Sequence, residues 1–160
     1  MNFTFATADL IDKLPDLPSC EINFKCYGKK SKFFGKIRTV QCFRDNGLVK
    51  QVLQTPFPGG VLVVDGGGSY SSALMGDLIA RMAIDHGWAG VIVYGVIRDS
   101  AVINTMDFGI KALGTNPRKS AKAGKGQVDV PVEFGNVIFS PGDYLYSDED
   151  GILVASQSLV

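Results

Sequence analysis

Two short groups of polar residues carry the residue types from which a site for a small acid is built. The first is Gly76-Asp77 and the second, twenty residues further on, is Arg98-Asp99. An arginine presents a planar fork that fits a carboxylate, and an aspartate presents a hard oxygen ligand for a divalent cation. Together they point to a metal-assisted reaction on a small organic acid.

The position of Arg98-Asp99 strengthens this interpretation. The pair directly follows the apolar run VIVYGVI, which has the composition of a buried strand. A polar pair at that point lies at the carboxyl edge of a sheet, where ligands bind in open α/β sheets.

Gly76 interrupts an amphipathic pattern that predicts a helix over residues 71–86. Glycine inside a helix costs about 1 kcal/mol relative to alanine, so the position needs a reason. One reason is close packing against a strand. The other is that the helix breaks and restarts, which leaves the N–H groups of Asp77, Leu78 and Ile79 free for an anionic ligand. The pattern does not choose between them.

Local sequence also leaves a purely structural alternative open for both groups. Asp77, Arg81 and Asp85 recur at i, i+4 spacing, which suits a solvated salt-bridge face of a helix. Arg98 and Asp99 have the alternative of a surface ion pair.

A glycine-rich turn, DGGGS at 65–69, does not fit a nucleotide site. The dinucleotide pattern GxGxxG would need glycine where Ser71 stands, and no lysine follows at phosphate-loop spacing. Two interpretations remain, a tight connection between strand and helix or a backbone nest for an anion.

Two continuous apolar runs must position these groups. VLVVD (61–65) and VIVYG (91–95) have the length and composition of strands buried on both faces. The helical pattern between them is long enough for a crossover, so we expect the two strands to be parallel neighbours.

The remaining segments are expected to complete one α/β domain over residues 1–160, with a parallel segment and a β-rich end. The polar and basic stretch 114–127 is expected to be an exposed loop, and the alternative for its basic part, residues 118–125, is a contact with RNA or another protein. We expect helices at 7–15, after Asp45 or Asn46, and at 100–106, and strands at 35–43, 110–113 and four short runs after 127.

Composition excludes several classes of protein. Lysine plus arginine and aspartate plus glutamate both number 16, so no strongly basic footprint for nucleic acid exists and direct nucleic-acid binding is not expected. No run of 18 apolar residues predicts a membrane span, and the N-terminus lacks the basic region of a signal peptide, which favours the cytoplasm. Three cysteines without CxxC spacing and one histidine argue against zinc and Cys–His chemistry, so the thiols are expected to be free.

The sequence resembles the RraA-like proteins, a family that contains 4-hydroxy-4-methyl-2-oxoglutarate aldolases and regulators of ribonuclease E activity. The resemblance covers nearly the whole chain. It is carried by the DGGGS turn, the GD…RD spacing, KALGTNP and the ending PGD…D-x-DG, which occur in that order.

This resemblance implies a three-layer β/β/α swivelling-domain fold, assembled as a homotrimer with active sites near subunit interfaces. It implies that residues 76–79 (Gly76, Asp77, Leu78 and Ile79) bind substrate and that Arg98 holds the substrate carboxylate. Asp77 and Arg98 would be the catalytic residues, and Asp99 would bind Mg²⁺ or Mn²⁺ through a water-rich shell.

The implied chemistry is a class II aldol cleavage of 4-hydroxy-4-methyl-2-oxoglutarate to two pyruvates. Decarboxylation of oxaloacetate passes through the same pyruvate enolate and is the expected side activity. Longer aldolases of the family add a C-terminal acidic residue from a neighbouring subunit, whereas this sequence ends at Val160. The alternative from a different class is a protein that binds and inhibits ribonuclease E without turnover. Retention of Asp99 favours the lyase.

Overall fold

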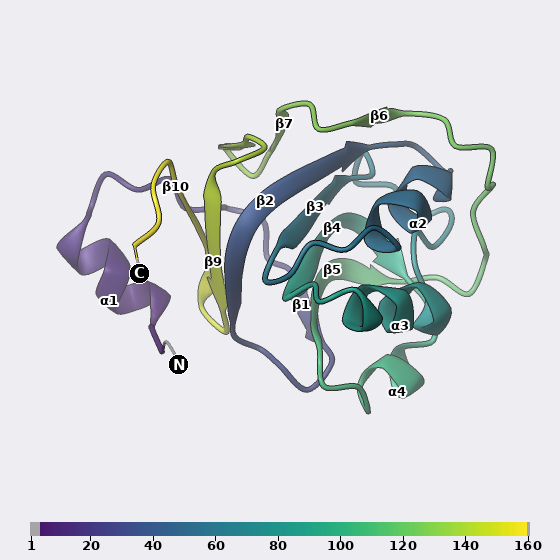
Figure 1. The fold of residues 1–160 in the computed structure, drawn as a ribbon, viewed down its shortest axis with the longest axis horizontal. Helices are drawn as coiled ribbons and strands as arrows, with labels where there is room; N and C mark the ends of the chain where they lie inside the picture. Colours follow the sequence, from purple (N-terminus) through teal and green to yellow (C-terminus); the bar gives the residue numbers. More distant parts are fainter. Residues whose placement is uncertain (1–3, 160) are drawn as a thin grey trace.

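A curled mixed sheet forms the centre of the molecule in the computed structural model, which describes residues 4–159 (Figure 1). Its hydrogen-bonded order is β1-β5-β4-β3-β2-β9-β10, and β6 pairs with β2 outside this path. The strands of the sheet are β1 (Lys25–Tyr27), β2 (Phe33–Gln41), β3 (Val61–Asp65), β4 (Gly90–Ile97), β5 (Gly109–Thr115), β6 (Gln127–Val128), β9 (Tyr144–Asp148) and β10 (Gly151–Ala155).

The four central strands β2, β3, β4 and β5 are parallel, which the buried apolar runs predict for β3 and β4. Val61 of β3 lies opposite Gly90 of β4, and Asp65 lies opposite Tyr94. Because parallel strands end at the same edge of a sheet, the residues that follow β3 and β4 meet there. Arg98 and Asp99 follow β4 directly and therefore lie at this edge.

Helices cover one face of the parallel strands. α2 (Gly47–Leu53) and α3 (Asp77–Asp85) lie side by side on this face, and the short α4 (Ser100–Ile103) adjoins α3 (Figure 1). The apolar side chains of β2, β3 and β4 interdigitate with those of the helices in one buried cluster, which includes Val64, Val93, Val52, Leu53 and Ala80. Burial of one such side chain stabilises the folded state by about 1.5–3 kcal/mol. The packing of this layer therefore holds α3, and with it the first turn of the helix, at a fixed place on the sheet.

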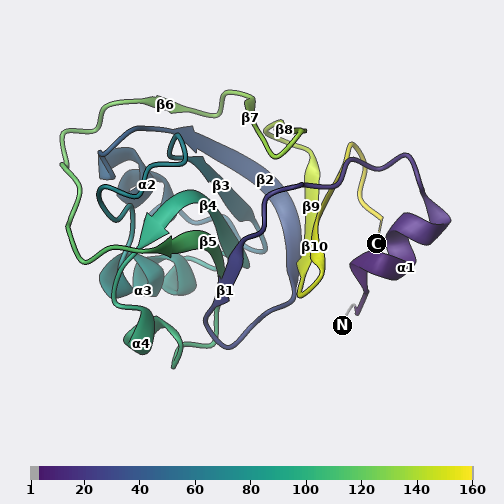
Figure 2. The ribbon, with the colours of Figure 1, turned by 180° about the vertical axis from the view of Figure 1, so that it is seen from behind.

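The opposite face of the sheet carries a second, smaller β layer. The hairpin of β7 (Val132–Phe134) and β8 (Val137–Phe139) packs over it, with β9 and β10 continuing beside β2 (Figure 2). Phe134 stacks on both Tyr94 and Phe139, with ring centroids 4.7 and 4.5 Å apart. The predicted three-layer β/β/α arrangement is confirmed.

The N-terminal segment closes the far end of the sheet, away from α2 and α3. α1 (Thr7–Lys13) packs against β9 and β10 (Figure 1). Its first residue is held by Asp148, whose carboxylate accepts the Thr7 backbone N–H at 2.7 Å and the Thr7 hydroxyl at 2.6 Å. No helix within residues 4–159 combines the length and apolarity that crossing a bilayer requires.

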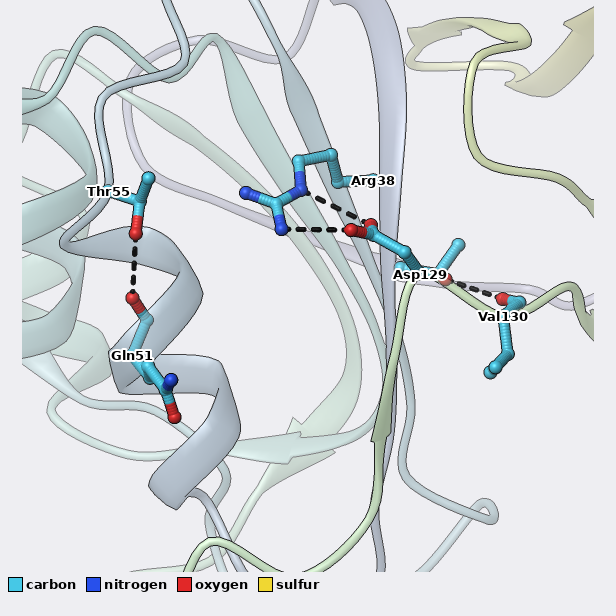
Figure 3. A network of polar contacts seen from close by, with 6 residues as sticks. Arg38, Gln51, Thr55, Asp129 and Val130 are labelled. Atoms are coloured by element: carbon cyan, nitrogen blue, oxygen red, sulfur yellow. Dashed lines mark hydrogen bonds and ion pairs between the residues drawn. The ribbon is translucent and has the colours of Figure 1, made fainter.

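A long connection, residues 116–131, leaves β5 and returns to the sheet at β2; we refer to it as the strap. Its far end is fixed on β2 by β6 and by Arg38, whose Nε and guanidinium nitrogen donate to the two oxygens of Asp129 at 3.2 and 2.9 Å (Figure 3). Thr39 also donates its hydroxyl to the Val130 carbonyl. The predicted exposed loop is confirmed for most of residues 116–126, although Ser120 is buried and residues 114, 115 and 127 belong to strands; the segment is also anchored to the body of the molecule.

Candidate functional site

α3 begins at Asp77, and the prediction of a helix from Ser71 is wrong for its first six residues. The segment before Asp77 is extended and adds backbone bonds on both sides: Leu74 N–H donates to the Val96 carbonyl, Ala73 N–H to the Arg118 carbonyl. Arg98 N–H in turn donates to the Met75 carbonyl at 3.0 Å. These partners compete with the local helix, and the side-chain periodicity does not reveal them.

Gly76 stands at the point where this extended segment turns into the helix. A Cβ atom there would come within 2.5 Å of Asp99 Oδ2 and 3.3 Å of Arg98 Cγ. The second alternative for Gly76 holds only in part, because α3 begins at Asp77 with no helix before it to restart and the Asp77 N–H is bound by Asp99. The lack of a side chain at Gly76 lets Asp99 approach the first turn of α3. The Leu78 and Ile79 N–H groups have no hydrogen-bond partner among the described residues.

Asp99 reaches α3 because of an unusual backbone conformation. Its φ of 58° and ψ of 35° lie in the left-handed region, which few non-glycine residues occupy. Although Asp99 precedes α4, its carboxylate does not cap that helix; Oδ2 instead accepts the Asp77 N–H at 3.2 Å. Oδ1 has no protein partner in the described part of the chain, and the side chain is 39% exposed. One carboxylate oxygen therefore remains available to a ligand.

Arg98 lies beside this carboxylate. Its Nε is 4.0 Å from Asp99 Oδ2, which is an ion pair but too long for a hydrogen bond. A terminal guanidinium nitrogen donates to the Pro117 carbonyl of the strap at 3.4 Å. The surface ion pair expected as an alternative is present, yet it leaves most of the guanidinium donors unused.

One pocket of about 270 Å³ gathers all the residues that the sequence singled out. The first turn of α3 and the end of β4 form one wall, with Gly76, Asp77, Leu78, Ile79, Arg98 and Asp99 all lining it. The Asp77 carboxylate forms no ion pair with Arg81 within residues 4–159, so the salt-bridge face is not formed.

Sequence reasoning missed the opposite wall. Lys50 of α2 and two lysines of the strap, Lys119 and Lys122, line the same pocket. Nothing in the local pattern of α2 marks Lys50, which is simply a basic residue in the last turn of an amphipathic helix. The basic stretch 118–125 was a signal, but it indicated RNA or protein contact and not a place in this pocket.

A buried carboxylate, Asp45, holds this second wall together. Its oxygens accept the Gly47, Ala123 and Gly124 N–H groups at 2.9–3.0 Å, which joins the start of α2 to the strap. Burial raises the pKa of the Asp45 carboxyl, but the backbone hydrogen bonds outweigh it and the net pKa is lowered. The Asp45 carboxylate therefore stays charged. It accepts the Gly47 N–H, whereas the side chain of Asn46 does not cap α2.

The glycine-rich turn after β3 offers no anion site. The Gly66 and Gly68 N–H groups donate to the Tyr94 carbonyl, and the Gly67 N–H donates to Asp65 Oδ1 at 2.9 Å. With these amides engaged inside the protein, the backbone nest is wrong. The turn itself is tight, but it leads into the non-helical residues 70–76 and not directly into a helix.

The thiols remain structural. All three cysteines are free, as expected. Burial, followed by the nearby carboxylates of Asp45 and Asp65, raises the pKa of the Cys42 thiol to about 12. That thiol is therefore not a nucleophile at neutral pH.

The donor set of the pocket fits a hard divalent cation. The described residues contain no cluster of three or more histidine, cysteine, aspartate or glutamate side chains. Mg²⁺ commonly takes one or two protein carboxylates and keeps several waters. Asp99, with a free oxygen, and Asp77, on the same wall, provide that type of site.

Comparison with known proteins agrees with this architecture. The family model for RraA-like proteins, described as Aldolase/RraA, matches residues 7–154. The chain belongs to the RraA-like family. This RraA-like protein is 52% identical to a Geobacillus kaustophilus protein described as an S-adenosylmethionine:2-dimethylmenaquinone methyltransferase, with a TM-score of 0.95 and 97% of each chain covered.

Two further similar structures carry RraA descriptions, and the first is described as an RNA-processing inhibitor. The RraA of Thermus thermophilis is 42% identical, with a TM-score of 0.95, and the match covers 99% of this chain and 96% of that one. An unusual member of the RNase ES inhibitor RraA family from Streptomyces coelicolor is 29% identical, with a TM-score of 0.77 and coverage of 93% and 78%. This RraA-like protein thus has a single-domain α/β fold that known RraA structures share.

Proposed function

We propose that this RraA-like protein is a divalent-metal-dependent lyase. It would cleave 4-hydroxy-4-methyl-2-oxoglutarate to two pyruvates and decarboxylate oxaloacetate as a secondary activity. The observation that carries the proposal is the junction of β4 and α3. There, a guanidinium with unused donors, a carboxylate with a free oxygen and two unpartnered helix N–H groups line one small pocket.

Arg98 and the start of α3 would bind the 2-oxo acid end of the substrate. A guanidinium holds a carboxylate with two parallel hydrogen bonds, and such charge-assisted bonds are about twice as strong as neutral ones. The Leu78 and Ile79 N–H groups, at the positive end of the α3 dipole, supply further donors for the same anion.

Asp99 would be the metal ligand, with Asp77 close enough in the pocket to share the water shell. A divalent cation held there would supply Lewis-acid polarisation of the substrate's keto oxygen.

The Asp77 carboxylate would move the proton. In aldol cleavage a base takes the proton of the 4-hydroxyl, the C3–C4 bond breaks, and pyruvate leaves from the C4 side. The other half is the enolate of pyruvate, which takes a proton at C3. Asp77 has no hydrogen bond to its carboxylate within residues 4–159, so it is free to act through an ordered water.

Pyruvate release measured with Mg²⁺ or Mn²⁺, and again with EDTA, tests this proposal. Turnover of either substrate that EDTA abolishes and added metal restores is the expected result. Absence of turnover on both substrates, or turnover indifferent to EDTA, would overturn it.

A second candidate, inhibition of ribonuclease E, is favoured by a specific observation. The relative described as an RNA-processing inhibitor is 42% identical to this chain, and an unusual member of the RNase ES inhibitor family is 29% identical. Titration of the protein into a ribonuclease E cleavage assay tests it, and Asp99→Ala separates the two functions because a binding surface does not need the metal ligand.

The methyltransferase description of the Geobacillus protein is not carried over to this chain. The amides of the glycine-rich turn form hydrogen bonds inside the protein. The described residues that line the pocket include no aromatic ring on which the adenine of S-adenosylmethionine would stack. We also propose that the protein assembles as a homotrimer, an expectation that rests on the family resemblance.

A further inference from the structure

Three exposed lysines, Lys50 of α2 and Lys119 and Lys122 of the strap, line the same pocket as Arg98 and Asp99. The ammonium groups of Lys50, Lys119 and Lys122 form no ion pair or hydrogen bond within residues 4–159. With Arg98 against Asp77 and Asp99, the pocket has four cations and two carboxylates, a formal charge of +2. The protein as a whole has a formal charge of zero, so this positive charge is concentrated locally.

The three lysines are held on this wall by their backbones. The strap is bonded at Ser120, whose hydroxyl donates to the Ala73 carbonyl at 2.7 Å and lies 2.8 Å from the Ser72 hydroxyl. Ala73 also forms isolated bridges to both Val96 and Lys119, which ties the strap to the end of β4.

α2 is attached to the same strap. The Asn46 N–H donates to the Ala121 carbonyl at 2.9 Å, and the Asp45 carboxylate binds the amides on either side of this contact. The bonds from Asp45 join α2 to the strap, so the backbones that carry the three lysines are held together beside the pocket that Arg98 also lines.

We propose that Lys50, Lys119 and Lys122 bind the distal carboxylate of a dicarboxylic 2-oxo acid. Its 2-oxo acid end would lie against Arg98 and Asp99. The inference rests on the proposed function, because it takes that end of the substrate as given. With the divalent cation of the proposed function also bound, the formal charge of the pocket rises from +2 to +4, so a second carboxylate on the substrate is favoured there, whereas a monocarboxylic acid leaves more of this charge uncompensated. The lysines would therefore select dicarboxylic over monocarboxylic 2-oxo acids.

Binding of two acids of equal chain length tests this selection without any need for turnover. 2-Oxoglutarate and 2-oxopentanoate both have five carbons and the same 2-oxo acid end, and only the first has a second carboxylate. Titration calorimetry with Mg²⁺ should show 2-oxoglutarate binding about tenfold or more tightly to the unaltered protein, since hydrogen bonds to charged groups are the stronger class.

The triple variant Lys50→Gln, Lys119→Gln, Lys122→Gln should lose this preference. Its affinity for 2-oxopentanoate should change less than about twofold, because the 2-oxo acid end is untouched. The matched control is Lys36→Gln, which removes one exposed lysine from β2 outside the pocket and should behave as the unaltered protein. Thermal unfolding of all variants checks that the fold is retained.

The outcomes separate the two proposals. Equal binding of both acids to the unaltered protein, or equal loss for both acids in the triple variant, overturns the lysine assignment and leaves the proposed function standing. Failure of both acids to bind overturns the proposed 2-oxo acid chemistry itself, and the lysine assignment with it.

Discussion

Replacement of Gly76 by alanine tests whether the contact between Asp99 and α3 matters for catalysis. The new Cβ would stand 2.5 Å from Asp99 Oδ2, so the carboxylate must retreat by about 0.9 Å to reach an ordinary contact of 3.4 Å. The backbone of Gly76, at φ −133° and ψ −160°, is extended and open to alanine, so no backbone strain is added. The change therefore acts mainly on the position of Asp99, with a smaller adjustment of Arg98, whose Cγ would lie 3.3 Å from the new Cβ.

The expected loss of activity is much larger than the loss of stability. Misplacing a reacting group by 1 Å costs on the order of 100-fold in rate, so kcat/KM for pyruvate release should fall by about that factor. Loss of the bond from the Asp77 N–H costs about 1 kcal/mol, because it is one partly exposed hydrogen bond. In a domain of this size that lowers Tm by only about 2–4 °C.

Gly114→Ala is the matched control. Gly114 lies in β5 outside the pocket, and the nearest atom to an added Cβ is Tyr70 Cε1 at an ordinary 3.4 Å. Steady-state kinetics and thermal unfolding of both variants supply the data. A Gly76→Ala enzyme with kcat/KM within about twofold of the unaltered protein would refute the reasoning, and so would an equal loss in both variants.

The remaining predictions concern the same pocket and its supports. Asp99→Ala should abolish metal-dependent pyruvate release while thermal unfolding shows a retained fold; normal turnover with Mg²⁺ would mean that Asp99 is not the ligand. Arg98→Lys should lower kcat/KM by roughly ten- to hundred-fold on both oxaloacetate and the aldol substrate, because an ammonium lacks the two-pronged fork. Loss on one substrate alone would show that the two bind in different poses. Asp45→Asn should destabilise the protein at pH 7 in urea unfolding. Burial raises the pKa of the Asp45 carboxyl in the folded protein, but the backbone hydrogen bonds lower it further than burial raises it. The charged carboxylate therefore contributes its full stability at pH values above the unfolded pKa of about 3.9. That contribution is lost as pH falls through the lower folded pKa, and a stability gap between the two proteins that persists unchanged in acid would contradict this cause. Light scattering at micromolar concentration should give the mass of a trimer, and a stable monomer would contradict that assembly.

The sequence predicted the parallel centre of the fold well, because burial on both faces leaves an unmistakable pattern. β3 has the predicted bounds of 61–65, and β4 extends the predicted 91–95 by one residue before and two after. Arg98-Asp99 could be placed at the sheet edge for the same reason, since strand polarity alone determines which end of β4 they follow.

What the sequence could not predict depends on contacts between distant segments. The helical periodicity over 71–86 conceals an extended stretch, because Ala73 and Leu74 find backbone partners on the strap and β4. In the sequence, Lys119 and Lys122 have the pattern of solvated loop residues. Only the structure shows that Asp45, more than seventy positions earlier, binds the strap that carries them. A local pattern carries no information about such partners.

The left-handed conformation of Asp99 has a cost in stability. A non-glycine residue in that region costs on the order of 1 kcal/mol, whereas glycine adopts it freely. Asp99→Gly would relieve that cost, but it would also remove the bond from the Asp77 N–H, which contributes about 1 kcal/mol. The two effects nearly cancel, so selection for heat resistance alone would neither keep nor remove this carboxylate. Selection for activity is then what retains Asp99 in the pocket.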